Sequence, residues 1–276
     1  MVDKKHSPAI LGIDLGSRNV KLCLMKDGTV ESRNIIESME FYRKYGARTE
    51  DGFSVNISAL GFSNVDFIVA TGYGRMSVAL TGAESISELK AHFLGALFQS
   101  GLETFTLLDM GGQDYKVIHV KNGRMVDMAT NDKCAASTGR YLENMANVLG
   151  ISLDEIGQYY EDPVNLSSTC AIFGESELIG LIVKGERIDR LAAGVNRSVV
   201  ERIAPLLERM GEDIIVMSGG VALNRAVVKI VGEMSGKEVR VLDDPLYNGA
   251  IGCCLNICGG ISVKQLKFLT RRNSAI

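Results

Sequence analysis

Phe105-Thr-Leu-Leu-Asp109-Met110-Gly111-Gly112-Gln113-Asp114 is an apolar run that ends in an acidic, glycine-rich turn. The run is short and is closed by a turn, so it predicts a buried β-strand. Polar and apolar residues alternate over Tyr115–Val120, and Lys121-Asn122-Gly123-Arg124 carries an Asn-Gly pair typical of a tight hairpin. This part of the chain is therefore predicted to form strand, turn, strand, hairpin and strand.

The same pattern occurs near the N-terminus. The apolar stretch Ala9–Asp14 runs into Asp14-Leu15-Gly16-Ser17, and Lys26-Asp27-Gly28-Thr29 supplies an Asp-Gly hairpin. The two copies start about 95 residues apart, counted from Asp14 to Asp109. The repeat predicts a duplicated α/β fold with one domain over residues 1–99 and a second over residues 100–246. Residues 247–276 are expected to form a terminal helix that packs back on the first domain.

Apolar residues at helical spacing predict the helices of the chain. Ile188–Met210 is expected to be one long amphipathic helix that Pro205 bends. Shorter helices are predicted over Ser85–Gln99, Ala135–Leu149, Ile172–Val183 and Tyr247–Cys258. Further strands are predicted over Phe67–Ala70, Ile214–Met217 and Val239–Leu242.

The composition excludes several classes of protein. The 276 residues carry 30 basic and 33 acidic side chains, a formal net charge of −3, so the broad basic surface of a nonspecific nucleic-acid binder is absent. No apolar stretch approaches the roughly 20 residues that a membrane-spanning helix needs. Asp14 and Arg18 interrupt the apolar stretch that follows Lys4 and Lys5, which favours a first strand over a signal peptide. We therefore expect a cytoplasmic protein whose six cysteines are thiols or metal ligands.

Three glycine-containing turns each follow a predicted buried strand, and the third is Ser218-Gly219-Gly220. Glycine lets backbone N–H groups approach phosphate oxygens closely. Asp14 and Asp109 close the first two strands, where carboxylates would hold Mg²⁺ through water. The P-loop and Rossmann patterns are missing from the sequence. We predict that phosphate groups are held by Gly16, Ser17, Gly111 and Gly112.

Together these residues resemble the actin/hexokinase/Hsp70-like ATPase superfamily. Within it, the chain is most similar to the activator ATPases of 2-hydroxyacyl-CoA dehydratases and to the related ATPase subunits of benzoyl-CoA reductase. The resemblance covers residues from about 10 to 260, and its two cysteine-containing segments are more specific than its phosphate loops. The matching segments are Gly12-Ile-Asp14-Leu-Gly16-Ser17, Ala70-Thr71-Gly72-Tyr73-Gly74-Arg75, Asp109–Asp114, Asn131-Asp132-Lys133-Cys134-Ala135-Ala136, Cys170-Ala171-Ile172-Phe173, Glu175-Ser176-Glu177 and Ser218-Gly219-Gly220-Val221-Ala222.

The resemblance implies a fold of duplicated actin-like (ribonuclease H-like) ATPase domains with a nucleotide cleft between them. It implies that adenosine is lined by Gly219, Gly220 and Ala222. It also implies that Gln113 or Asp114 orients the attacking water, because both lie beside the γ-phosphate in this family. Lys21 fits the family pattern, although Arg18-Asn19-Val20 stands where the family often has small hydroxyl residues. Glu88 and His92 fit as well, whereas Lys90 and Ala91 depart from the usual Thr and Cys.

Two cysteines have the surroundings of cluster ligands. Cys134 and Cys170 each follow a polar turn and precede a predicted helix, whose N-terminal N–H groups and dipole stabilise a thiolate or an anionic cluster. A [4Fe–4S] cluster needs four cysteines, which a two-fold dimer supplies if the site lies on its axis. The resemblance implies this arrangement, with one cluster shared by two subunits. Cys23 is expected in the core, and helix packing is favoured over metal ligation for Cys253, Cys254 and Cys258.

The resulting functional hypothesis is an ATPase coupled to low-potential electron transfer. The resemblance implies a homodimer that takes electrons from ferredoxin or flavodoxin and passes them to an iron–sulfur dehydratase or reductase component. A kinase for a sugar or amino sugar is the alternative on the same fold, because fold alone does not determine function. A nucleotide-switched structural or chaperone-like protein is a third hypothesis. Neither alternative requires iron at Cys134 and Cys170.

Overall fold

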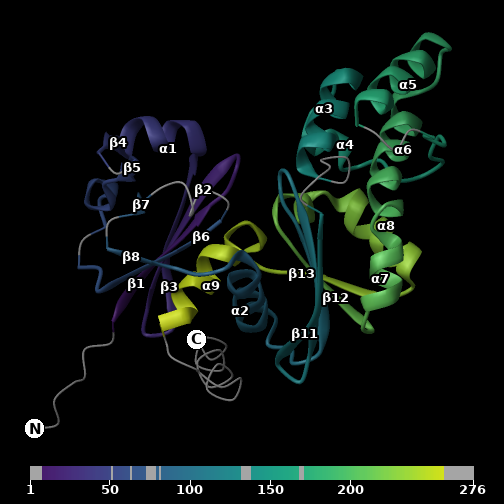
Figure 1. Cartoon of the computed structure of the whole chain (residues 1–276). Coiled ribbons are helices and arrows are strands. Elements are labelled where there is room, and N and C mark those ends of the chain that lie inside the picture. The colour runs from purple at the N-terminus through teal and green to yellow at the C-terminus, as the bar shows by residue number, and fades with distance from the viewer. Residues whose placement is uncertain are drawn as a thin grey trace, which may run out of the picture. The chain divides into compact units, whose positions relative to one another are not determined.

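The computed structural model describes residues 8–257, apart from 51, 63, 73–78, 81, 132–137 and 168–170. The chain divides into two compact units (Figure 1). Unit 1 comprises the described part of residues 1–101 and 246–276, and unit 2 comprises that of residues 102–245. Within the described ranges, no helix has the length and apolar character needed to cross a membrane.

Unit 1 is built on a five-stranded sheet in the order β3-β2-β1-β6-β8. The first three strands are antiparallel, whereas β6 and β8 continue the sheet in parallel. The strands are β1 (Ala9–Leu15), β2 (Asn19–Lys26), β3 (Thr29–Glu37), β6 (Phe67–Thr71) and β8 (Ala83–Ser85). A second, three-stranded sheet contains β4 (Gly46–Thr49), β5 (Gly52–Val55) and β7 (Ala79–Leu80).

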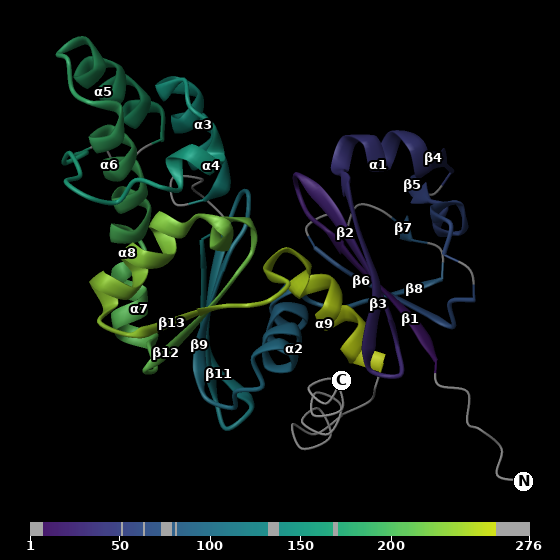
Figure 2. The ribbon, with the colours of Figure 1, turned by 180° about the vertical axis from the view of Figure 1, so that it is seen from behind.

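Both faces of the unit 1 sheet are covered, which is why every residue of β1 is buried. Helices α2 (Glu88–Ser100) and α9 (Asn248–Ile257) pack together on one face, as Figure 2 shows from behind. Ile10 contacts that helical layer, while Leu11 and Ile13 belong to the core on the opposite face. The opposite core includes Phe41 of α1 (Ser38–Tyr45). A strand buried on both faces reads as a continuous apolar run, as observed here.

Unit 2 repeats this architecture with the sheet order β11-β10-β9-β12-β13. Its strands are β9 (Phe105–Met110), β10 (Tyr115–Lys121), β11 (Arg124–Asn131), β12 (Ile214–Ser218) and β13 (Glu238–Val241). One large apolar core joins the sheet to its helices. These helices are α3 (Gly139–Leu149), α4 (Leu153–Ile156), α5 (Ala171–Val183), α6 (Ile188–Glu201), α7 (Ala204–Met210) and α8 (Arg225–Ser235).

The two hairpins of the repeat have matching turns. Asp27 and Gly28 have φ angles of 54° and 74°, and Asn122 and Gly123 have 53° and 69°. Two consecutive positive φ angles are the mark of a type I′ turn, whose twist suits a two-residue hairpin and which Asn or Asp followed by Gly adopts most easily. The α/β fold and the internal duplication predicted from the sequence are therefore confirmed.

The predicted helix over Ile188–Met210 is wrong in one respect, because the structure contains two helices there rather than one bent helix. α6 ends at Glu201, and α7 begins at Ala204 with Pro205 in its first turn. Proline is well tolerated in a first turn because its missing N–H has no intrahelical partner there. The predicted start of the helix over Ala135–Leu149 lies outside the described residues; within them, Thr138 is extended, with φ −132° and ψ 173°, and α3 begins at Gly139.

Candidate functional site

The first candidate phosphate loop connects β1 to β2 in unit 1. Asp14 lies at the end of β1 and is 4% exposed. The register of the sheet places Lys21 of β2 opposite Asp14, and Lys21 Nζ lies 3.3 Å from Asp14 Oδ2. Lys21 is less buried than its partner, with 19% of its side chain exposed. The loop therefore presents a held carboxylate and a lysine with access to solvent.

The backbone of this loop is fixed from two directions. Ser38, the first residue of α1, donates its hydroxyl to the Gly16 carbonyl at 2.7 Å and its N–H to the Arg18 carbonyl at 2.8 Å. A Cβ at position 16 would lie 2.6 Å from the Asn19 carbonyl oxygen and 2.8 Å from Lys21 Nζ. Only glycine fits this position without a shift of the backbone. Ser17 is exposed beside it and available to a ligand.

The second candidate phosphate loop connects β9 to β10 in unit 2. Asp109 closes β9 and is 2% exposed. Ser218, at the end of β12, donates its hydroxyl to Asp109 Oδ1 at 2.5 Å. Lys116, opposite Asp109 in the sheet, places its Nζ 3.9 Å from Asp109 Oδ2 and 2.6 Å from Asp114 Oδ2. Asp109 is thus a buried carboxylate held by a hydroxyl on one side and an ammonium group on the other.

Helix α3 sets the direction of the amide groups in the second loop. Gly139 N donates to the Gly111 carbonyl at 2.9 Å, and Arg140 N donates to the Gly112 carbonyl at 3.0 Å. In a trans peptide the N–H points opposite to the carbonyl of the same peptide group. The N–H groups of Gly112 and Gln113 therefore point away from α3. This is the orientation that a loop needs to present consecutive N–H groups to an anion.

The two residues predicted to orient a water molecule differ in their surroundings. Gln113 is exposed at the tip of the loop. Asp114 is half-buried, forms the short ion pair with Lys116, and accepts a 2.9 Å hydrogen bond at its carbonyl from Gly111 N. Asp114 therefore closes the loop on itself, whereas Gln113 projects from it.

The candidate adenosine loop follows β12. Gly219 has φ 84°, and a Cβ there would lie 2.3 Å from the Met110 carbonyl oxygen, so the loop crosses directly over the end of β9. Gly219 N donates to the Pro245 carbonyl at 2.9 Å. Gly220 is exposed and begins the short 3₁₀ helix Gly220–Leu223. Ala222 is 4% exposed and packs in the core, and its N–H donates to the Gly219 carbonyl at 3.3 Å.

The same construction occurs at the equivalent strand ends of unit 1. Gly72 follows β6 with φ 99°, and a Cβ there would lie 2.5 Å from the Leu15 carbonyl oxygen. The preceding residue, Thr71, is buried and carries a hydroxyl group, as Ser218 does in unit 2. In both units, therefore, the glycine that follows one strand lies directly against the end of the neighbouring strand.

Sequence reasoning missed Lys116 and Ser218, which hold Asp109. The repeat contained a signal for the lysine, because Lys21 follows Asp14 by seven residues and Lys116 follows Asp109 by the same number. A buried lysine is rare unless it is paired. Once the two copies of the repeat are aligned, Lys116 is therefore a candidate partner for the Asp109 carboxylate. Ser218 was identified only as the first residue of the third glycine-containing turn, with no role for its hydroxyl group.

Lys116→Met is expected to lower the free energy of unfolding by about 3 kcal/mol, because the buried carboxylate of Asp109 loses its neighbouring cation. Lys121→Met is the matched control, since Lys121 lies exposed at the end of the same strand and its loss is expected to cost about 0.5 kcal/mol or less. Urea unfolding of both variants measures the difference. Equal stabilities would mean that the charge of Lys116 does not compensate Asp109.

The described residues fit Mg²⁺ at the phosphate loops. Asp14 and Asp109 supply carboxylate oxygens, which hard cations prefer. In the described part of the chain, no group of three or more His, Cys, Asp and Glu side chains is placed to form a metal cage. Mg²⁺ needs no such cage, since it commonly keeps several waters and takes its remaining ligands from one or two carboxylates and from phosphates.

The predicted cluster ligands Cys134 and Cys170 lie outside the described residues, and so does Cys258. Cys23, Cys253 and Cys254 are buried free thiols at the interface between the unit 1 sheet and α9. Cys254 Sγ donates to the carbonyls of Ile10 at 3.5 Å and of Cys23 at 3.3 Å. Burial raises the pKa of both Cys253 and Cys254, which keeps them protonated. These three cysteines are core residues, as the sequence predicted.

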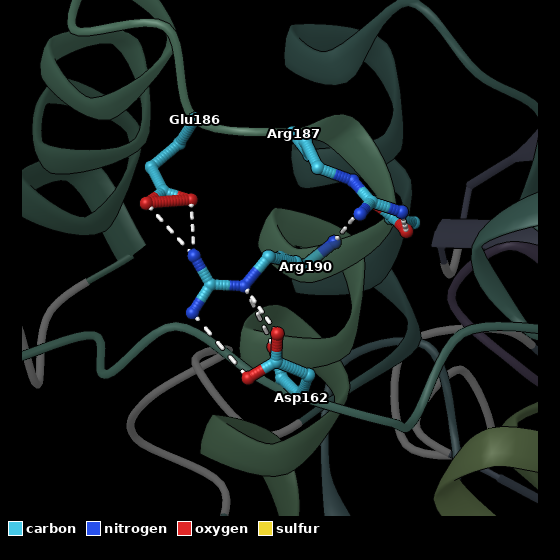
Figure 3. Close-up of polar contacts among 5 residues, drawn as sticks. Asp162, Glu186, Arg187 and Arg190 are labelled. Carbon is cyan, nitrogen blue, oxygen red and sulfur yellow. Dashed lines mark hydrogen bonds and ion pairs between the residues drawn. The ribbon is translucent and has the colours of Figure 1, made fainter.

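The chain segment that leads to Cys170 is held against α5 and α6. Glu177 Oε1 accepts hydrogen bonds from Ser167 N at 2.9 Å and from Ser167 Oγ at 2.8 Å. Figure 3 shows Arg190 of α6 between two carboxylates, with its Nε 2.8 Å from Asp162 and its Nη1 2.7 Å from Glu186. α5 itself begins at Ala171, the residue after Cys170. The polar contacts thus hold Ser167 to α5 and Asp162 to α6.

Comparisons with known proteins identify relatives of this chain. The (R)-2-hydroxyglutaryl-CoA dehydratase activating ATPase of Acidaminococcus fermentans is 40% identical over 251 residues, which cover 89% of this chain and 95% of that protein. The structure of the A. fermentans (R)-2-hydroxyglutaryl-CoA dehydratase component A matches with a TM-score of 0.75 and 34% identity, covering 94% of this chain and 99% of that one.

A second solved structure is that of the activator of the 2-hydroxyisocaproyl-CoA dehydratase from Clostridium difficile with bound ADPNP. It matches with a TM-score of 0.76 and 30% identity, covering 97% of this chain and 98% of that one. The structural neighbours have the actin-like ATPase fold, which confirms the predicted fold class. Residues 11–256 match the family model described as the BadF/BadG/BcrA/BcrD ATPase family. The resemblance inferred from the motifs is thus confirmed, and the chain belongs to the BadF/BadG/BcrA/BcrD ATPase family.

Proposed function

We propose that this ATPase is an iron–sulfur electron donor that reductively activates a 2-hydroxyacyl-CoA dehydratase or a related reductase. The observation that carries the proposal is the pair of buried aspartates, each opposite a lysine at a glycine-rich turn, in a chain that is 40% identical to a dehydratase-activating ATPase. ATP hydrolysis supplies the energy for an electron transfer that a simple ferredoxin would not drive.

Mg·ATP is assigned to the three loops. Asp14 and Asp109 would position Mg²⁺, and Lys21, which is partly exposed beside Asp14, would bind a phosphate oxygen. Gln113 orients the attacking water, because it is exposed at the loop tip while Asp114 is paired with Lys116. Phosphoryl transfer depends mainly on such positioning and charge neutralisation. The backbone contacts come from Gly16, Ser17, Gly111, Gly112, Gly219, Gly220 and Ala222.

Cys134 and Cys170 supply two thiolates per chain, and two chains together hold one [4Fe–4S] cluster. When bound, the cluster supplies a one-electron carrier. The homodimer is supported by the surface of α5, where Phe173, Ile179 and Val183 are 69%, 48% and 82% exposed. Large apolar side chains gathered on one exposed helix mark an interaction surface. Ferredoxin or flavodoxin is proposed as the electron source, in a reducing cytoplasm that keeps the thiols free.

Removal of iron is expected to weaken the dimer, because the metal links the two chains. Sedimentation at low protein concentration, with and without iron removed by chelation under anaerobic conditions, measures the shift toward monomer. Val183→Lys tests the apolar contribution separately and is expected to weaken the dimer without removing a metal ligand. If the iron-free protein stays fully dimeric, the cluster has no structural role in the dimer, and an apolar contact holds the two chains together instead.

A further inference from the structure

His92 is a buried histidine that the proposed roles do not yet use. It lies on α2, is 7% exposed, and faces the N-terminal end of α9. A Cβ at Gly249 of α9 would lie 3.1 Å from His92 Nε2 and also 3.1 Å from Asp14 Oδ2. The imidazole nitrogen and the carboxylate oxygen therefore both lie beside the same point of α9, where one water molecule can link them. Glycine at 249 is what leaves room for them.

Two amide side chains determine which nitrogen of His92 carries the proton. Gln99 Nε2 donates to Asn248 Oδ1 at 3.0 Å, which directs the NH₂ group of Asn248 toward His92. Asn248 Nδ2 then donates to the His92 carbonyl at 3.0 Å and lies 3.4 Å from His92 Nδ1. An NH₂ group has no acceptor, so Nδ1 accepts and the proton resides on Nε2. Asn248 is fully buried, so its contacts with His92 are shielded from bulk solvent.

We infer that His92 is a positioning residue for Asp14: through one bridging water, its Nε2–H stabilises the Asp14 carboxylate in the orientation that faces Mg²⁺. The inference deepens the proposed nucleotide site and rests on it. Lys21 holds the same oxygen, Asp14 Oδ2, from the partly exposed side. A phosphate group competes for Lys21 when the nucleotide binds, whereas His92 is held from the interior by Asn248 and does not move with the ligand. His92 thus keeps Asp14 in place when Lys21 binds phosphate.

His92→Leu is expected to raise the Mg²⁺ concentration needed for half-maximal ADP binding about tenfold, the lower end of the effect of losing an outer-shell partner at a metal site. His92→Gln keeps an N–H donor near the position of Nε2 and is expected to retain most of the Mg²⁺ affinity. The readout is calorimetric titration of the holoprotein with ADP at a series of Mg²⁺ concentrations. ATP hydrolysis gives a second readout, with KM for Mg·ATP raised and kcat at saturating Mg²⁺ nearly unchanged.

His119→Leu is the matched control. His119 pairs with Glu212 at 2.6 Å on β10 of unit 2 and is no part of the loops, so its loss is expected to leave the Mg²⁺ dependence unchanged. Melting temperatures of all variants are measured alongside. Where His92→Leu does not fold, Gly249→Ala replaces it, because the added methyl group displaces Asp14 and His92 and is expected to weaken Mg²⁺-dependent binding in the same way.

The outcomes separate the inference from the function on which it rests. Wild-type protein that binds ADP without any dependence on Mg²⁺, or not at all, overturns the proposed nucleotide site. Normal wild-type binding with an unchanged Mg²⁺ dependence in folded His92→Leu or Gly249→Ala overturns the positioning role alone. A loss in His92→Leu that His92→Gln shares in full also overturns it, since the effect would then come from packing rather than from the donor.

Discussion

Asp109→Asn is expected to lower the turnover of ATP hydrolysis about 100-fold or more, since Mg²⁺ and its bound phosphates lose a charged partner worth several kcal/mol. The substitution changes little else. Asn keeps an oxygen that can accept the hydrogen bond from Ser218, and Lys116 keeps its 2.6 Å ion pair with Asp114. The loss should therefore appear in catalysis and in Mg²⁺ dependence rather than in the fold.

Steady-state hydrolysis and nucleotide affinity, measured side by side, test this expectation. Asp127→Asn is the control, because Asp127 lies exposed on β11 of the same sheet and carries no assigned role. The melting temperatures of both variants identify any loss of fold. Turnover that is unchanged in Asp109→Asn would remove Asp109 from the nucleotide site.

Cys134→Ser and Cys170→Ser are each expected to abolish the [4Fe–4S] cluster. A serine hydroxyl is a poor substitute for the thiolate, and the two-fold axis makes one substitution remove two of the four ligands. Iron per dimer should fall to near zero in either variant under strictly anaerobic conditions. ATP hydrolysis should persist, because the nucleotide loops are separate in sequence from both cysteines.

The other cysteines provide the controls for this experiment. Cys23, Cys253 and Cys254 are buried between the unit 1 sheet and α9, and the pKa of Cys253 and of Cys254 is raised by burial. Serine at any of these positions, or at Cys258, is expected to leave the iron content unchanged. Full iron in Cys134→Ser, or lost iron in Cys254→Ser or Cys258→Ser, would falsify the assignment of the ligands.

The sequence predicted the centre of each unit well, for a physical reason. β1 and β9 are buried on both faces, so each is a continuous apolar run that stops abruptly at an acidic, glycine-rich turn. Few other residue pairs can adopt the positive φ angles at Asp27-Gly28 and Asn122-Gly123. The two hairpin turns could therefore also be predicted from the sequence. Local chemistry alone determines these features.

The features that were missed depend on contacts distant in sequence. β4 and β5 are short, with no marked alternation, and exist because they pair with each other and because β5 also pairs with β7. α1 was missed as well, although its first residue, Ser38, closes the first phosphate loop. The burial of Lys116 follows from two carboxylates, and the tautomer of His92 follows from Asn248, 156 residues further along the chain. No pattern of neighbouring residues in the sequence predicts these long-range contacts.

The most direct test of the central claim is the iron content and visible spectrum of the protein purified without oxygen. We expect a brown protein with about four irons per dimer, whose spectrum bleaches on reduction and is lost in air. Its ATP hydrolysis should require no added small-molecule phosphate acceptor. A colourless, iron-free protein that forms ADP only when a sugar or amino sugar is supplied would contradict the account and identify a kinase instead.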